Sequence, residues 1–216
     1  MSKKNIFRVV LFTGTAISLF FVPWLLVKAW ILPLPATVQE QLDQAIGHGF
    51  EGMIVCVDQG GEPQFFASGW HNRESEIPAK PNALFKIASI SKLYDAAAVT
   101  KLVNAGRLSL DKTIADYLPD LVGEIENAET ITLRLMIQHR SGMPNFTDAP
   151  KFWEAPTETF EESLALIAGH PANFEPGEDY EYCNTNYLLI NKIMDNELGY
   201  GNFQFIQDEI LTPLHL

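Results

Sequence analysis

The 216-residue sequence has only two cysteines, little positive charge beyond its N-terminus and a single long apolar run. Two cysteines, Cys56 and Cys183, are too few for a disulfide framework. Both have apolar or aromatic neighbours, so we expect a small buried thiol at each position. Neither has the His and Cys neighbours that a zinc site requires. The cysteines therefore predict neither a disulfide scaffold nor a zinc site.

Basic residues are scarce after residue 36. Four of the 15 basic residues but none of the 27 acidic residues lie in residues 1–36, so residues 37–216 keep 11 basic residues and a net charge of −16. A strongly negative protein repels polyanions. The charge balance therefore argues against nucleic acid, or an anionic membrane surface, as a partner of residues 37–216.

The apolar run covers Val9–Val27, contains no charged residue and follows three basic residues. Its 19 residues approach the length that an α-helix needs to cross a bilayer. Pro23 interrupts it and leaves a 14-residue stretch that also fits the apolar region of a signal peptide. Trp24 and Trp30 resemble interfacial anchors. The N-terminus thus predicts one membrane-spanning or signal helix.

We expect an uncleaved anchor rather than a signal peptide, because the nearest cleavage sequence, Leu34–Ala36, is poor. Positive charge before the span keeps the N-terminus inside. The expected organisation is a membrane anchor or signal segment in residues 1–36 and an exported domain in residues 37–216. That domain would be anchored on the periplasmic or extracellular side, or secreted if the segment is cleaved.

The rest of the chain is organised around residues 85–106, where Ser89 and Lys92 lie three positions apart. In a helix, this spacing puts both side chains on one face. A serine becomes a nucleophile when a base takes its proton, and lysine serves if it is neutral near pH 7. Apolar neighbours such as Ile90 and Leu93 predict burial of the amine, which disfavours its charged form. Ser89 would lie near a helix N-terminus, which favours developing negative charge.

Two alternatives need no chemistry. An S-x-x-K pattern also arises from a surface serine and a solvated lysine. In addition, Asp95 follows Lys92 by three residues and would hold it in an ordinary ion pair. Such a pair favours the charged amine and works against a base.

A second pattern, Tyr182 and Asn184, follows the Pro176–Gly177 loop and directly precedes an apolar helix. Two residues apart in a loop, their side chains project to the same side. The phenol would then share a proton with the Ser–Lys pair, and the amide would hold a substrate carbonyl. The alternative is a tyrosine packed on the core and an asparagine that caps the next helix.

The remaining patterns predict helices and one β-hairpin. Thr37 and Glu40 fit a capping box that opens a short helix. A hairpin is expected from residues 52–57 and 64–69, with Met53, Val55 and Phe65 on one apolar face. Further helical stretches are expected at residues 130–139, 159–168 and 203–211, and residues 180–198 are expected to run into a helix that Gly199 ends.

Taken together, these blocks resemble the serine β-lactamase and penicillin-recognising enzyme superfamily, most closely its class C β-lactamase-like, D-Ala-D-Ala carboxypeptidase-like branch. The resemblance runs from residue 52 to residue 216. The blocks, in the family's order, are FKIASISK at 85–92, AGRLSLD at 105–111, YLP at 117–119, HRSGMP at 139–144, PG at 176–177, YCNTNY at 182–187 and LTPL at 211–214.

The resemblance implies an α+β fold, with helices packed on an antiparallel sheet. It also implies that Ser89 is the acylated nucleophile, that Lys92 and Tyr182 manage its proton, and that Asn184 contacts the substrate. The implied activity is that of a serine hydrolase on an amide or ester, such as a β-lactam, a D-Ala peptide or an ester, without metal or organic cofactor. The partner would be a small-molecule or peptide substrate. His139 falls in a structural block, so we expect it to pack rather than act as a base.

The sequence departs from the family pattern in two places. Asp95 stands where the resemblance leads us to expect a small or hydroxyl residue. The third family motif, Lys-Thr-Gly or His-x-Gly on a later strand that supplies an oxyanion-hole N–H, is absent from Thr185–Leu216. Residues 37–216 are therefore expected to be the N-terminal part of a β-lactamase-related domain. The alternative function is an inactive truncated remnant that serves, if at all, as a membrane-anchored binding or interaction module.

Overall fold

The computed structural model describes residues 3–31 and 35–216. The chain divides into two compact units, Met1–Lys86 and Ile87–Leu216. The predicted organisation places its boundary at residue 36, just after residues 32–34, which are outside the described residues. The cleavage sequence considered at Leu34–Ala36 also falls partly there, so that boundary stays a prediction.

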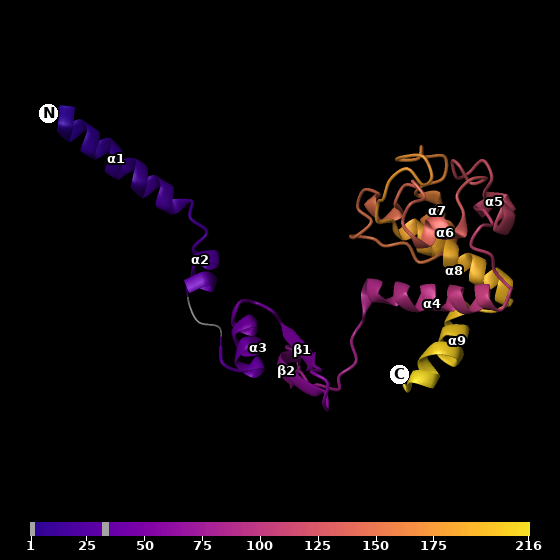
Figure 1. Cartoon of the computed structure of the whole chain (residues 1–216), viewed down its shortest axis with the longest axis horizontal. Helices are drawn as coiled ribbons and strands as arrows, with labels where there is room; N and C mark the ends of the chain where they lie inside the picture. Colours follow the sequence, from indigo (N-terminus) through magenta and orange to yellow (C-terminus); the bar gives the residue numbers. More distant parts are fainter. Residues whose placement is uncertain (1–2, 32–34) are drawn as a thin grey trace. The chain divides into compact units, whose positions relative to one another are not determined.

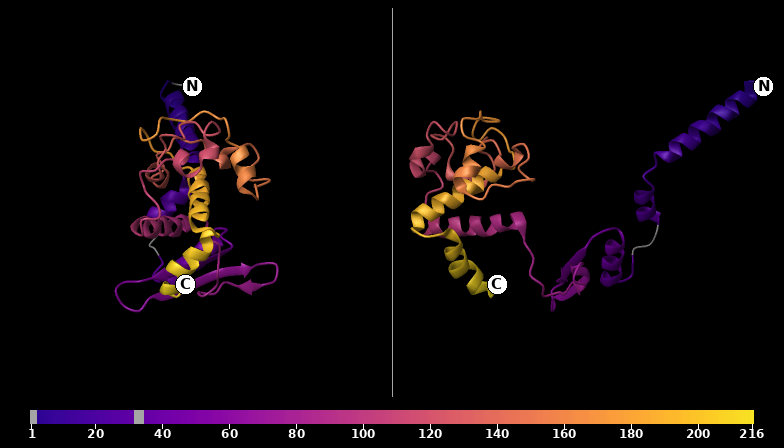
Figure 2. Two further views of the ribbon diagram at one scale, coloured as in Figure 1. Left: turned by 90° about the vertical axis from the view of Figure 1, so that its right-hand side faces the viewer. Right: turned by 180° about the vertical axis from the view of Figure 1, so that it is seen from behind.

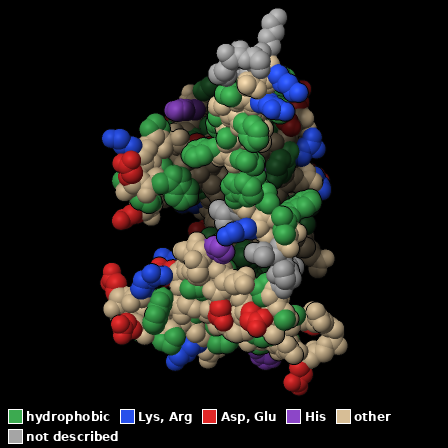
Figure 3. Space-filling view, turned by 90° about the vertical axis from the view of Figure 1, so that its left-hand side faces the viewer, with side chains coloured by type: hydrophobic (Ala, Val, Ile, Leu, Met, Phe, Trp, Pro, Cys, Tyr) green, Lys and Arg blue, Asp and Glu red, His purple; other side chains and the backbone are tan. Residues whose placement is uncertain are grey.

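The first unit begins with two helices, α1 (Lys3–Phe20) and α2 (Trp24–Ile31), separated at Pro23. Their apolar side chains are largely exposed, and hydrophobic side chains gather over these helices in the upper part of Figure 3. Within the described ranges, no helix is both long and apolar enough to cross a membrane. The predicted membrane-spanning helix is therefore not confirmed.

The predicted hairpin is confirmed, and it forms part of a small antiparallel sheet. Strands β1 (Gly52–Val57), β2 (Gln64–Asn72) and β3 (Ile77–Pro78) lie in the order β1-β2-β3. Helix α3 (Val38–Gly47) packs on β2, and its Asp43 carboxylate accepts a 2.6 Å hydrogen bond from the Ser68 hydroxyl. Its N-terminus carries the predicted capping box, which Thr37 and Glu40 form.

The strand register corrects two expectations. Val55 lies opposite Phe66 and Cys56 lies opposite Phe65. Directly opposed residues share a face and alternate residues do not, so Phe65 lies on the face opposite to Val55 and Met53. The predicted shared apolar face was therefore wrong. The thiol of Cys56 is exposed rather than buried, because little covers its face, whereas Cys183 is buried as predicted.

The second unit, Ile87–Leu216, is helical. Its two long helices are α4 (Ser91–Asn104) and α8 (Asn184–Leu198), and α8 lies between α4 and α6, whereas α9 packs against α4 (Figures 1 and 2). The short elements are η1 (Ala88–Ile90), α5 (Ile114–Tyr117), η2 (Pro119–Leu121), α6 (Leu133–Ile137), η3 (Phe146–Asp148), α7 (Phe160–Ala165), α9 (Asn202–Ile206), η4 (Gln207–Leu211) and η5 (Thr212–Leu214). All four helical stretches predicted after residue 130 are present: α6 and α7 are shorter than expected, α8 begins at Asn184, and α9 with η4 covers residues 202–211.

One hydrophobic core holds this unit together. Val99 from α4, Leu133 from α6 and Leu189 from α8 are all inaccessible to solvent. The helix ends follow from local chemistry: the Thr132 hydroxyl accepts from the Leu135 N–H at the start of α6, and Gly199 ends α8 in a left-handed conformation, φ 78°. The observed fold class is α+β, as predicted.

Candidate active site

Ser89 and Lys92 lie on one face at the start of α4. A short 3₁₀ turn, η1, carries Ser89 and runs directly into the helix. The Lys92 Nζ donates a hydrogen bond to the Ser89 Oγ at 3.1 Å. The structure thus brings the two side chains of the S-x-x-K pattern into contact, while Ser89 itself stays exposed.

Tyr182 and Asn184 reach the same place from the start of α8. The Tyr182 hydroxyl donates to the Ser89 Oγ at 2.7 Å, and Lys92 Nζ donates to the Asn184 Oδ1 at 2.9 Å. All four predicted site residues therefore meet, although about 90 residues of chain separate the two pairs. A serine whose hydroxyl touches both an amine and a phenol has two neighbours that can exchange its proton.

The surroundings of Lys92 differ from the expected apolar envelope. Ile90 and Leu93 are 54% and 70% exposed, because α4 turns the face with Ala98 and Val99 into the core instead. The lysine nitrogen lies 5.2 Å from the ring centroid of Tyr182. Two oxygen acceptors and an aromatic face stabilise an ammonium ion. Ile90 and Leu93 therefore do not supply the apolar cover that was expected for this amine.

The phenol of Tyr182 loses its proton more readily than that of an ordinary tyrosine. Partial burial opposes its ionisation, but the nearby Lys92 ammonium and the hydrogen bond with Ser89 outweigh that cost and lower the pKa of Tyr182. A tyrosinate at this position would accept a proton from Ser89 across 2.7 Å. Geometry and charge thus favour Tyr182 as the proton acceptor.

Asp95 is buried one turn beyond Lys92, with 8% of its surface exposed. Burial raises its pKa to about 6, and the positive charge of Lys92 offsets only part of this effect. Among the ion pairs that join described residues, none links Asp95 to Lys92. The ion pair considered as an alternative is therefore not formed.

Two residues that follow the HRSGMP block, Asn145 and Thr147, form hydrogen bonds with Asn184. The Asn184 Nδ2 donates to the Thr147 Oγ1 at 3.0 Å, and its backbone N–H donates to the Asn145 Oδ1 at 3.0 Å. Cys183 occupies the N-cap of α8, so the Asn184 side chain is not the helix cap. Sequence reasoning missed Asn145 and Thr147. Their polar character directly after Pro144 was the only available signal.

The loop before Tyr182 is fixed against the 139–144 turn. The Gly177 N–H donates to the Arg140 carbonyl at 2.9 Å, and the Asn173 N–H donates to the Gly142 carbonyl at 2.8 Å. Gly142 has φ 76°, and a Cβ there would lie 1.9 Å from the Phe174 carbonyl oxygen. Only glycine allows this close approach. The turn therefore sets the course of the chain into the site.

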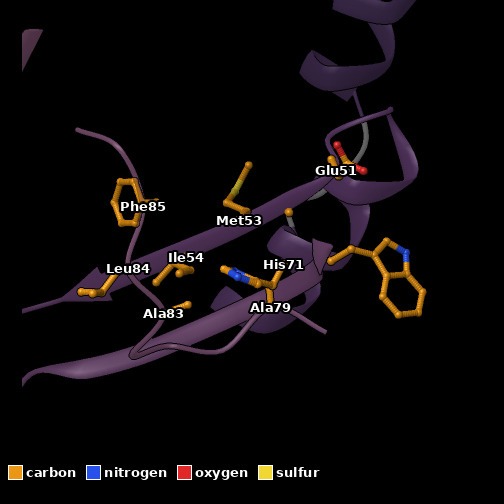
Figure 4. Close-up of a pocket in the computed structure, with 10 residues that line it drawn as sticks. Glu51, Met53, Ile54, His71, Ala79, Ala83, Leu84 and Phe85 are labelled. Atoms are coloured by element: carbon orange, nitrogen blue, oxygen red, sulfur yellow. The ribbon is translucent and has the colours of Figure 1, made fainter. Parts of the chain in front are cut away.

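The first unit has a cavity of about 480 Å³ beside the sheet. Figure 4 shows Met53 and Ile54 on β1, with Leu84 and Phe85 alongside from the segment that follows β3. Its lining is mainly apolar and includes no serine or cysteine nucleophile. In the described part of the chain, no three His, Cys, Asp or Glu side chains are grouped to hold a metal ion.

Comparisons with known proteins agree on one family. Residues 34–216 match the family model described as Beta-lactamase. Protein flp of Staphylococcus aureus (strain COL) is 26% identical, and the aligned region covers 82% of this chain and 37% of that protein. Penicillin-binding protein 4 of Amycolatopsis lactamdurans is 29% identical, with 78% of this chain and 44% of that protein covered.

Two solved structures are similar in fold. D-amino acid amidase from Ochrobactrum anthropi SV3 has a TM-score of 0.73 at 28% identity, over 82% of this chain and 49% of that one. A D-stereospecific amidohydrolase from Streptomyces sp. has a TM-score of 0.72 at 25% identity, over 82% and 54%. The chain thus spans about half of the length of these structures and less than half of the two relatives above.

Proposed function

The chain belongs to the beta-lactamase family, and from this premise we propose that it is a serine hydrolase that forms an acyl-enzyme at Ser89. The observation that carries the proposal is the pair of hydrogen bonds that Ser89 Oγ accepts, from Tyr182 at 2.7 Å and from Lys92 at 3.1 Å. Ser89 is exposed, so water could satisfy its hydroxyl, and these two hydrogen bonds are not needed to hold the fold together.

The proposed first step is a proton transfer. Tyr182, as the phenolate, takes the proton of Ser89, while the Lys92 ammonium stabilises the negative oxygen. The Ser89 Oγ then forms a bond to the carbonyl carbon of the substrate. As the bond to the leaving nitrogen or oxygen breaks, Tyr182 returns the proton to that atom. Water next attacks the ester and releases the acid and Ser89.

Asn184 acts through Lys92 in this scheme. Its Oδ1 accepts from the ammonium at 2.9 Å, and Thr147 fixes its other amide group. The amide therefore aims Lys92 at Ser89. Contact of Asn184 with the substrate, which the family resemblance implies, remains part of the proposal. A neutral Lys92 that takes the proton directly is the competing assignment.

The proposed substrates are amides and esters of small molecules or short peptides. Two similar structures bear the names D-amino acid amidase and D-stereospecific amidohydrolase, and one relative is named as a penicillin-binding protein. These names make D-amino acid amides, D-Ala peptides and β-lactams the first candidates. No metal or organic cofactor takes part in the proposed steps.

A substrate panel tests the proposal. The full natural protein would be assayed with D- and L-phenylalanine amide, a chromogenic β-lactam and a short acyl ester. We expect turnover of at least one substrate, loss of that turnover in Ser89→Ala, and little change in Ser91→Ala, the matched control two residues away. Turnover that persists in Ser89→Ala would contradict the proposal.

A second candidate is a binding module without turnover. Its support is the printed name of one relative, Penicillin-binding protein 4, which describes binding rather than turnover. It predicts saturable binding of a β-lactam or D-Ala peptide that Ser89→Ala leaves unchanged, with no product. Calorimetric titration of the parent and Ser89→Ala proteins separates the two candidates.

We further propose that residues 1–36 direct export, as a membrane anchor or as a cleaved signal. The support is the sequence pattern of basic residues before an apolar run. A reporter that is active only in the cytoplasm, fused to the C-terminus, should stay silent. A strong signal would contradict export, and a mature N-terminus near Thr37 would identify a cleaved signal rather than an anchor.

A further inference from the structure

His139 makes three contacts with the segment that carries Tyr182. Its backbone carbonyl accepts a hydrogen bond from the Glu181 N–H at 3.0 Å, and its Nδ1 accepts one from the Cys183 N–H at 3.1 Å. Its ring packs against the Tyr182 ring, with centroids 4.6 Å apart and planes inclined by 31°. One residue thus holds both neighbours of Tyr182 and the phenol ring itself.

The backbone of His139 has an unusual conformation that accompanies these hydrogen bonds. Its φ of 55° lies in the left-handed region, which non-glycine residues seldom occupy. In this conformation the carbonyl and the imidazole both bind the segment 181–183. A residue that only filled space would not need such a backbone, so the conformation itself points to a specific role.

The imidazole also has an aromatic neighbour from α8. Tyr187 packs against it with centroids 5.4 Å apart and planes inclined by 35°. Tyr182 is 43% exposed, so its own burial holds it only weakly. The His139 ring, itself fixed by Tyr187, therefore restrains the phenol near Ser89.

The hydrogen bonds also define the protonation state of His139. The Cys183 backbone N–H, which can only donate, lies 3.1 Å from Nδ1, and the Asn186 side-chain amide lies 3.3 Å from the same atom. Nδ1 must therefore be unprotonated, which places the ring proton on Nε2. Burial, and then the positive charge of Lys92, lower the pKa of His139. The titratable or charged groups around it are Lys92 on α4, Tyr180, Tyr182 and Cys183 before α8, and Tyr187 on α8.

On the basis of the proposed function, we propose that His139 is the positioning residue of Tyr182 and that its neutral imidazole keeps the phenol in hydrogen-bond contact with Ser89. His139 neither touches the substrate nor exchanges a proton with it. Protonation of Nδ1 would remove the acceptor of the Cys183 N–H and add a second cation near Lys92. Acid should therefore release Tyr182 from Ser89.

The first test observes the tautomer directly. Long-range ¹H–¹⁵N spectra of the ¹⁵N-labelled chain report both nitrogens of each of the five histidines, and His139→Asn identifies the His139 signals. We expect the neutral Nε2–H form at pH 7, with protonation below the ordinary histidine value of 6.5. An Nδ1–H tautomer, or a protonated His139 ring at pH 7, would overturn the proposal.

The second test separates positioning from packing. His139→Asn keeps a residue that tolerates positive φ and offers an oxygen near Nδ1, but it removes the ring. Tyrosinate absorbance of a protein minus that of its Tyr182→Phe version isolates the Tyr182 titration. We expect Tyr182 to titrate below its ordinary value of 10.0 in the parent and closer to 10.0 in His139→Asn.

The matched control is His170→Asn, which should leave the Tyr182 titration unchanged. If His139→Asn lowers the melting temperature yet leaves the Tyr182 titration as in the parent, the ring serves packing alone and the proposal is wrong. If His139→Asn does not fold, the tautomer of His139 measured in the parent protein tests the proposal by itself. Neither readout requires turnover, so a chain that hydrolyses nothing would contradict the proposed function but not this assignment.

Discussion

At the scale of single residues, the protonation of Asp95 depends on its burial one turn from Lys92. The carboxylate would favour a charged Lys92, yet burial raises the pKa of Asp95 to about 6 from 3.8. Between pH 3.8 and pH 6, the Asp95 carboxyl is largely protonated in the native state but largely ionised in the unfolded chain. The stability that this group contributes is therefore fully present below pH 3.8 and is lost as the pH rises through 6.

Removal of this charge should stabilise the protein in alkaline solution. At pH 8 we expect Asp95→Asn to raise the free energy of unfolding by up to about 3 kcal/mol, and the gain should shrink as the pH falls below 6. Urea unfolding at pH 8 and pH 5 measures it. Asp120→Asn, at an exposed acid, is the control and should change little. A gain that is equal at both pH values would refute a titration origin.

The phenol of Tyr182 should matter for rate and not for folding. Tyr182→Phe keeps the ring that packs on His139 but removes the oxygen 2.7 Å from Ser89. We expect Ser89 acylation to slow by about 10²- to 10⁴-fold, the usual contribution of a positioned acid–base group. Labelling with a fluorophosphonate, quenched at a series of times, measures the rate of Ser89 modification. Tyr180→Phe, at an exposed neighbour, should label at the parental rate.

At the scale of elements, the 139–144 turn and the 173–183 loop form one clamp that precedes α8. Their backbones meet so closely that Gly142 leaves no room for a side chain. This contact accounts for the start of α8 at Asn184, directly after the segment that carries Tyr182. The Glu181 and Cys183 N–H groups donate to His139 in the turn, and the backbone of Cys183 is extended (φ −141°, ψ 120°), so this segment stays outside the helix.

Gly142→Ala should disrupt this clamp. Its Cβ would lie 1.9 Å from the Phe174 carbonyl oxygen, so the backbone must move. We expect a loss of stability several kcal/mol in size, within the range of severe overpacking. Gly106→Ala is a matched control, because Gly106 also has positive φ, 70°, but has open space around its Cβ position. It should cost only about 1 kcal/mol in unfolding free energy.

Local sequence patterns predicted where helices and strands form better than they predicted which side chains are buried or in contact. The capping box at Thr37, the hairpin and the stop of α8 at Gly199 depend on neighbouring residues, so they could be read from the chain. The exposure of Leu93 depends on which face of α4 meets the core, and the helix pattern alone did not show it. Likewise the contact of Tyr182 with His139 joins residues 43 apart, beyond any local signal.

At the scale of the whole molecule, the two units differ in how they are stabilised. In the second unit, 21 buried apolar residues form one cluster. Among the described residues of the first unit, only Leu42 is a buried apolar residue. Strand β1 pairs with β2 on one side alone within that described sheet. Hydrophobic burial supplies most folding free energy, so the second unit should be the more stable of the two.

Hydrogen exchange should reveal this difference. We expect amides of α4 and α8 to exchange slowly, through global unfolding, and amides of β1 and β2 to exchange at least tenfold faster through local opening. Peptide-level mass spectrometry of the chain measures both. Equal protection of the hairpin and the two long helices would mean that the first unit has a stabilising contact not evident from its own core.

The central claim is that Ser89 is the acylated nucleophile, and the most direct measurement is the site of a covalent adduct. The full natural protein would be treated with a fluorophosphonate or a β-lactam, digested and mapped by mass spectrometry. We expect a single adduct on Ser89, absent from Ser89→Ala and from Lys92→Ala but retained in Ser91→Ala. An adduct on Ser91 or Ser141, or labelling that survives in Ser89→Ala, would contradict the account.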